Sequence, residues 1–110
     1  MEKREFKPFG TISALTLGGG GIGNIWGETT REESVLSVKL AIDLGINHLD
    51  VAPSYGKGEA ERVVGEALKE EDISSINLTT KCRLGTLPDS DVYERLNSSL
   101  CRSLQTIGVE

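Results

Sequence analysis

The 110-residue sequence is short of the features that mark several classes of protein. No apolar run approaches the roughly 20 residues that span a bilayer, and the start MEKREFKPFG lacks the apolar centre of a secretory signal. Aromatic residues make up only 5% of the chain, and 17 acidic residues outnumber 12 basic ones without forming a basic stripe. These absences argue against membrane insertion and nucleic-acid binding, and they favour a cytoplasmic location.

Cysteine is scarce as well. Cys82 and Cys101 have neither the CxxC spacing of redox motifs nor the spacing of zinc ligands. The sequence therefore predicts reduced thiols and no metal site. Cys82 directly follows Lys81, so a reactive role for its thiol is the alternative to an inert one.

Apolar residues recur with strand spacing in three places. Residues 11–17 predict a strand that runs into a glycine cluster, and residues 5–10 are its candidate hairpin partner, turning at Gly10. Two further strands are predicted over 46–51 and 76–81.

A helix is predicted after the glycine cluster. Thr30 and Glu33 have the spacing of a capping box, and Gly45 ends the pattern. The helix between them has a wide apolar face made of Val35, Leu36, Val38, Leu40, Ala41, Ile42 and Leu44.

Two more helices follow the second and third strands. One begins near Ala60 after a loop over 53–58. The other is predicted to be capped by Asp89 or Ser90 and to end at Gly108.

The alternation of strands and helices predicts right-handed βαβ units around a parallel sheet. The predicted strands begin about 30 to 35 residues apart, which is the size of one such unit. A closed (β/α)8 TIM barrel needs about 250 residues, and a three-stranded parallel sheet has two bare edges. We therefore expect residues 1–110 to be the N-terminal fragment of one such α/β barrel domain, with about three βα units and an N-terminal hairpin.

The glycine cluster has the spacing of a dinucleotide-binding fingerprint. Gly18, Gly20 and Gly23 fit GxGxxG, and Asp50 ends the next strand, where that fold has its ribose-binding acid. The fingerprint requires a helix that opens within the glycines, whereas the segment GNIWGETT delays the predicted helix. A turn that brings the backbone close to a neighbour is the alternative role of these glycines.

Three polar residues are expected to meet at the carboxyl edge of the sheet. Asp50 and Lys81 end strands that would lie about 4.8 Å apart, so an ion pair is predicted. Tyr55 follows on the loop after Asp50 and can fold back over the edge. The Lys81 cation would stabilise the Tyr55 phenolate, Asp50 would orient Lys81, and Tyr55 would exchange a proton with a carbonyl or alcohol. Each residue also has a purely structural alternative: Asp50 and Lys81 as an ordinary ion pair, and Tyr55 as a loop tyrosine that covers the barrel rim.

Two other candidate residues receive structural interpretations. His48 lies mid-strand, two residues before Asp50, and is interpreted as a hydrogen-bonded interior residue. Trp26 is predicted to pack within its loop, and a role as an aromatic substrate platform is the alternative.

Residues 45–68, GINHLDVAPSYGKGEAERVVGEAL, closely resemble the first signature of aldo-keto reductases. LGGGGIG is similar to the family's first loop, and LTTKCRLG to the strand that bears its catalytic lysine. The resemblance implies that Asp50, Tyr55 and Lys81 are three of four catalytic residues.

The same resemblance implies a cofactor and a substrate class. NADPH or NADH would carry the hydride, with NADPH preferred, and the substrate would be an aldehyde, ketone or sugar. Gly20, Gly21, Ile22 and Asp50 would lie nearest the nicotinamide.

The family's fourth catalytic residue is a histidine that ends strand four, and this sequence stops at IGVE, where that strand should begin. We therefore expect the 110 residues to be inactive alone. A reductase-like barrel that serves as a non-catalytic binding or regulatory subunit is the alternative.

Overall fold

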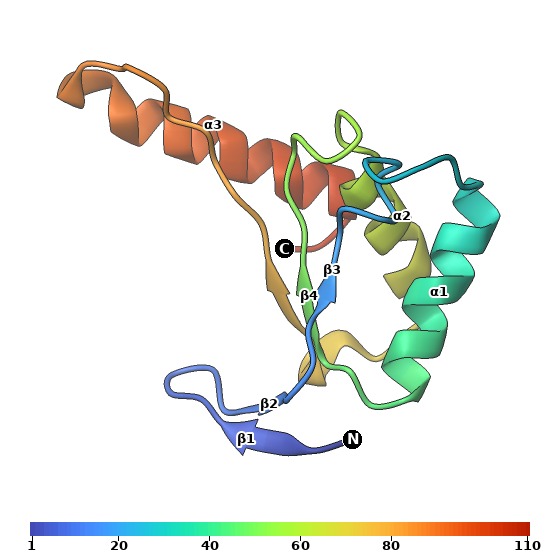
Figure 1. The fold of residues 1–110 in the computed structure, drawn as a ribbon. Helices are drawn as coiled ribbons and strands as arrows, with labels where there is room; N and C mark the ends of the chain where they lie inside the picture. Colours follow the sequence, from blue (N-terminus) through green and yellow to red (C-terminus); the bar gives the residue numbers. More distant parts are fainter.

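The computed structural model describes residues 1–110 and contains two small β-sheets (Figure 1). Strands β1 (Lys3–Glu5) and β2 (Thr11–Ser13) pair as an antiparallel hairpin. Strands β3 (Leu17–Gly18), β4 (His48–Asp50) and β5 (Asn77–Thr79) form a parallel sheet in the order β3-β4-β5. The predicted parallel sheet is confirmed. An N-terminal hairpin is present as predicted, but its first strand is Lys3–Glu5 and residues 6–10 form the connection, so the strand predicted over 5–10 is wrong.

Helices connect and follow the parallel strands. They are α1 (Arg31–Asp43), α2 (Glu59–Leu68) and α3 (Asp89–Ile107), and a short 3-10 helix, η1 (Ile73–Ser75), precedes β5. Helices α1 and α2 lie on the same side of the sheet (Figure 1). No helix combines the length and the apolar character that crossing a membrane requires.

The single strand predicted over 11–17 is wrong, because the chain bends between β2 and β3. Asn47 explains the bend: its buried Oδ1 accepts from the Ser13 amide at 2.7 Å, and its own amide donates to Ser13 Oγ at 3.1 Å. Its Nδ2 also donates to the Thr11 and Ser75 carbonyl oxygens at 3.0 and 3.2 Å. These bonds hold the hairpin at the amino ends of the parallel strands, opposite the glycine turn (Figure 1).

The predicted start and end of the first helix are confirmed. Thr30 caps α1, with both hydrogen bonds of the capping box to Glu33 present, and Gly45 follows the helix with a φ of 92°. A positive φ is strained in residues with a Cβ, which explains glycine at that position.

The last helix ends as predicted, at Gly108, which has a left-handed φ of 79°. Its predicted cap is wrong: Pro88 is the N-cap residue, and Asp89 already lies within the helix. No side chain caps α3. The fixed φ of proline suits the extended N-cap conformation, so Pro88 precedes the helix without a capping side chain.

Fewer apolar residues of α1 are buried than its sequence predicts. Val38 and Ala41 are buried, whereas Leu36, Leu40 and Leu44 are 65%, 58% and 63% exposed. Helix α1 packs against α2 on one side, so only the stripe of residues facing α2 and the sheet is covered.

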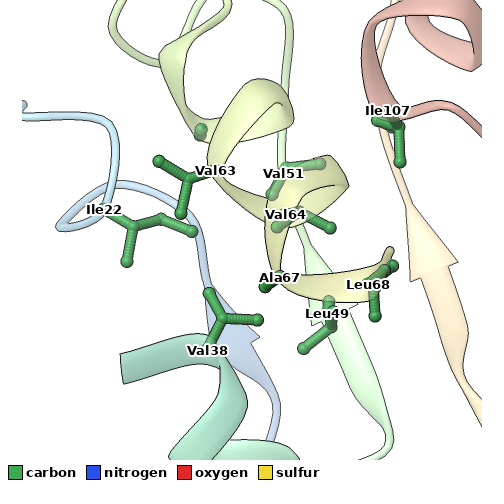
Figure 2. Packing of buried hydrophobic residues seen from close by; sticks show 10 residues of the cluster. Ile22, Val38, Leu49, Val51, Val63, Val64, Ala67, Leu68 and Ile107 are labelled. Carbon is green, nitrogen blue, oxygen red and sulfur yellow. The ribbon is translucent and has the colours of Figure 1, made fainter. Parts of the chain in front are cut away.

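The hydrophobic core lies between the parallel sheet and its helices (Figure 2). Leu49 and Val51 extend from β4 and its end toward the α2 side. The other members of this cluster are Ile22, Val38, Ala60, Val63, Val64, Ala67, Leu68 and Ile107. Side chains alternate along a strand, so His48 and Asp50 face away from this core. The polar candidates therefore project from the side of the sheet opposite α1 and α2.

Candidate active site

Asp50 and Lys81 form an ion pair at the carboxyl edge of the parallel sheet. Asp50 is the last residue of β4, and Lys81 follows β5. Lys81 Nζ donates to Asp50 Oδ1 at 2.7 Å and to the Val51 carbonyl oxygen at 2.9 Å. The predicted pair is confirmed, and side-chain exposures of 44% and 36% place it where solvent and small ligands have access.

Tyr55 folds back over this ion pair. Lys81 Nζ lies 4.9 Å from the centroid of the Tyr55 ring. The Tyr55 amide donates to the Ala52 carbonyl oxygen at 3.1 Å, and the Tyr55 carbonyl oxygen accepts from the Ala60 amide at 3.2 Å. This turn leads from β4 into α2 and fixes the half-buried tyrosine beside the lysine.

The surroundings of Lys81 favour its charged form. Partial burial alone would lower the pKa of Lys81, but the hydrogen bond to the Asp50 carboxylate and the nearby Tyr55 raise that pKa above its ordinary value. The residue is therefore an ammonium ion at neutral pH.

The glycine turn packs directly against the tyrosine loop. A Cβ atom at Gly19 would lie 2.8 Å from Val51 Cγ1 and 3.2 Å from Tyr55 Cδ2. A Cβ at Gly23 would lie 3.0 Å from the Tyr55 carbonyl carbon, and Gly56 has a φ of 62° with its backbone against Gly23. Close backbone approach is thus the structural role of these glycines.

The interpretation of this cluster as a dinucleotide fingerprint fails in the structure as well. Helix α1 begins only at Arg31, beyond the turn that contains Gly18, Gly20 and Gly23. The helix therefore does not begin within the glycine segment, and its N-terminal amides do not lie there, as binding of a pyrophosphate would require.

The predicted cofactor residues differ in what they present to a ligand. Ile22 is only 7% exposed and belongs to the core, and Gly20 is buried as well, whereas Gly21 is partly exposed. A Cβ at Gly20 would lie 2.9 Å from Trp26 Cζ2, whereas one at Gly21 would lie 3.7 Å from Trp26 Cε3. Trp26 packs against the turn as predicted, although its side chain remains 80% exposed.

His48 has both ring nitrogens engaged. Nδ1 lies 3.2 Å from Thr16 Oγ1, and Nε2 lies 2.9 Å from Thr79 Oγ1. His48 is hydrogen-bonded as predicted, but it is half-buried and not an interior residue. The two free thiols are half-buried at Cys82 and exposed at Cys101.

Sequence reasoning missed an ionic cluster that joins the first turns of α1 and α2. Arg31 donates from Nε and Nη2 to the two Glu59 carboxylate oxygens at 2.8 and 2.7 Å, and Arg62 Nε donates to Glu59 Oε2 at 3.1 Å. The hydrogen bond from Arg31 lowers the pKa of Glu59 against the opposing effect of burial. Acidic residues in the first turn of α2 were a signal for such a partner.

A second missed contact lies next to Lys81. Glu61 is only 2% exposed, and its Oε1 accepts from Thr80 Oγ1 at 2.7 Å. Helix α2 is thereby joined to the chain segment that leads to the lysine. Glu61 stands on the helix face that otherwise reads as apolar, with Val64 and Leu68, and that position was the available signal.

Comparison with known proteins gives the family of the chain. The model of the Aldo/keto reductase family matches residues 14–110. The NADH-specific methylglyoxal reductase of Escherichia coli (strain K12) is 32% identical over 117 residues, covering 91% of this chain and 36% of the relative. A Schizosaccharomyces pombe protein provisionally named voltage-gated potassium channel subunit beta is 38% identical over 103 residues. The match covers 83% of this chain and 29% of the relative.

A solved structure, the thermostable aldo-keto reductase Tm1743 with the inhibitor epalrestat, matches with a TM-score of 0.80 and 31% identity. The match covers 99% of this chain and 39% of that one. The chain belongs to the aldo/keto reductase family, and it spans about a third of the length of these relatives. The predicted fold class, the N-terminal portion of a (β/α)8 barrel, is confirmed.

Proposed function

We propose that residues 1–110 form the N-terminal part of a single aldo-keto reductase barrel domain. The complete domain reduces a small aldehyde, ketone or sugar carbonyl with NADPH or NADH, or catalyses the reverse oxidation. The family match over residues 14–110 supports this proposal. The observation that carries it is the convergence of Asp50, Tyr55 and Lys81 at the carboxyl edge of the sheet.

In the proposed reaction Tyr55 donates a proton to the carbonyl oxygen, or accepts one from the alcohol. A phenol is a weak acid at neutral pH, and a neighbouring cation stabilises the phenolate that remains after proton transfer. Lys81 supplies that cation 4.9 Å from the ring centroid, and Asp50 holds the ammonium in place at 2.7 Å. In this proposal Tyr55 transfers the proton, and Asp50 orients Lys81.

The residues present fit the reacting end of a nicotinamide cofactor. Gly21 presents a partly exposed backbone with no side chain, in the turn that packs against Tyr55 and hydrogen-bonds to Asp50. When bound, the cofactor supplies or accepts the hydride. In this proposal Gly20, Gly21 and the Ile22 backbone line its nicotinamide end, and Asp50 lies close by.

We further propose that the 110 residues do not turn over substrate alone. Orienting a carbonyl needs a second hydrogen-bond donor beside Tyr55, and the ring nitrogens of His48 already face Thr16 and Thr79. Reductase turnover by the purified 110-residue chain would contradict this part of the proposal.

Substitution of Lys81 by methionine in the complete barrel protein tests the proposed chemistry. Lys81→Met should lower kcat by about 100-fold or more, because general acid–base catalysis typically contributes 10²–10⁴-fold. Lys69→Met, at the exposed end of α2, is the matched control and should keep wild-type activity. Wild-type kcat in Lys81→Met, with the control also active, would remove Lys81 from the mechanism.

A second candidate function is a reductase-like barrel that acts as a binding or regulatory subunit. The 38% identity to the protein provisionally named as a potassium channel subunit beta favours this candidate. Such a subunit would keep the same three residues, so hydride transfer measured with a panel of carbonyl compounds separates the two functions. Cofactor binding without transfer to any of them would support the subunit.

A further inference from the structure

A cationic cavity lies beside the proposed catalytic residues, between the two loops at the carboxyl edge and helix α3. Its volume is about 540 Å³, within the range of small-molecule sites. Its lining includes three arginines, Arg83, Arg95 and Arg102, and no acidic residue. Lys81 also lines it, but the charge of this lysine is already paired with Asp50. The whole chain carries a net charge of −5, so this concentration of positive charge does not reflect a generally basic protein.

Helix α3 builds one wall of the cavity from a regular stripe. Arg95, Ser98, Ser99 and Arg102 are spaced at i, i+3, i+4 and i+7, so they share one face of the helix. Two guanidinium groups thus flank two hydroxyl groups on a rigid element. Arginine forks and serine hydroxyls are donors that suit the oxygen atoms of a phosphate group.

The three arginines of the cavity have no acidic partner within the chain. All five ion pairs of the structure involve other residues. Arg95 donates from Nε to the Arg83 carbonyl oxygen at 3.4 Å, which leaves its terminal NH2 groups available. Like charges gathered in a concave site repel one another, and a bound anion relieves that repulsion.

We propose that this cavity binds the phosphate group of a phosphorylated small molecule. A phosphate dianion meets three guanidinium groups, and the remaining volume admits an organic portion. The proposal is independent of the reductase chemistry, because it depends on Arg83, Arg95 and Arg102, which take no part in proton transfer.

Nuclear magnetic resonance of the ¹⁵N-labelled chain tests the proposal through its arginine Nε–Hε signals. Glucose 6-phosphate, glucose, inorganic phosphate and NADP⁺ are titrated separately at constant ionic strength. Saturating shifts are expected at Arg83, Arg95 and Arg102 with glucose 6-phosphate, while glucose has no effect and Arg4 stays unshifted. Glucose 6-phosphate should bind at least as tightly as inorganic phosphate.

Variants locate the site. Arg95→Gln and Arg102→Gln should each raise the Kd for glucose 6-phosphate about tenfold, as loss of a charge-assisted hydrogen bond predicts. Arg4→Gln removes an equal charge at an exposed position outside the cavity and should leave the Kd unchanged. Backbone amide spectra show whether each variant is folded. An unchanged Kd in a variant whose amide signals are well dispersed, and which is therefore folded, counts against the proposal.

Four results would overturn the proposal. They are the absence of saturation, equal shifts at Arg4, binding of inorganic phosphate alone, and binding of NADP⁺ without glucose 6-phosphate. The last result would assign the cavity to the cofactor instead.

Discussion

Removing the Asp50 charge should lower the pKa of Lys81 in the folded protein. In Asp50→Asn the ammonium loses a carboxylate at 2.7 Å but keeps the Val51 carbonyl oxygen at 2.9 Å. The two side chains are 44% and 36% exposed, so solvent screens the pair. Pairs of this kind contribute about 0.2–1 kcal/mol. Loss of the pair should therefore lower the pKa of Lys81 toward its ordinary value.

The same coupling predicts how the stability difference depends on pH. The pKa of Lys81 is raised in the folded state above the ordinary value of 10.5. The pair therefore stabilises the fold fully below pH 10.5, and this contribution is lost as the pH rises through the folded pKa. Asp50→Asn should thus cost about 0.2–1 kcal/mol at pH 8, and the cost should shrink above pH 10.5.

Titration of ¹³Cε-labelled lysines followed by nuclear magnetic resonance measures this pKa directly. Asp43→Asn, at the exposed end of α1, is the matched control and should leave the Lys81 titration unchanged. An unchanged or raised Lys81 pKa in Asp50→Asn would refute the view that Asp50 keeps the lysine charged.

Two predictions concern the scaffold that carries the site. Gly65→Ala should lower the free energy of unfolding by about 1–3 kcal/mol, because the new Cβ would lie 2.5 Å from the Ile107 carbonyl oxygen. Urea unfolding measures the loss, and wild-type stability would show that α2 and α3 are not so closely packed. Thr30→Ala should cost about 1 kcal/mol by removing the capping hydrogen bond to Glu33, and Thr30→Ser should recover most of it. A Thr30→Ser variant as unstable as Thr30→Ala in the same assay would show that the hydroxyl does not cap the helix.

Local rules were sufficient for much of the fold. Periodicity located the helices, and the chemistry of Thr30, Gly45 and Gly108 located three of their ends. The prediction failed where a distant residue decides the local path. The bend between β2 and β3 depends on Asn47, which lies more than 30 residues away along the chain and has no local signature.

The candidate site could be predicted in outline because adjacent parallel strands end at one edge. That rule was enough to pair Asp50 with Lys81. It could not give the Val51 carbonyl oxygen as a second acceptor, since a backbone atom carries no sequence signal. The contacts of Glu59 and Glu61 were missed for another reason, because their partners come from separate elements that only the folded chain brings together.

The burial of α1 shows a further limit of pattern reading. Its seven apolar residues predict one broad buried face, but the structure covers only the part that meets α2 and the sheet. An apolar stripe thus identifies a surface suited to packing, whereas its coverage depends on which elements are adjacent.

Single-turnover hydride transfer by Tyr55→Phe in the complete barrel protein tests the proposed proton donor most directly. The only other tyrosine, Tyr93, is 79% exposed on α3, so Tyr93→Phe is a matched control. Removing only the phenolic hydroxyl of Tyr55 should slow transfer by about 100-fold or more and leave cofactor affinity nearly unchanged, while Tyr93→Phe keeps the wild-type rate. Equal transfer rates in the two variants would contradict the assignment of Tyr55 as the acid.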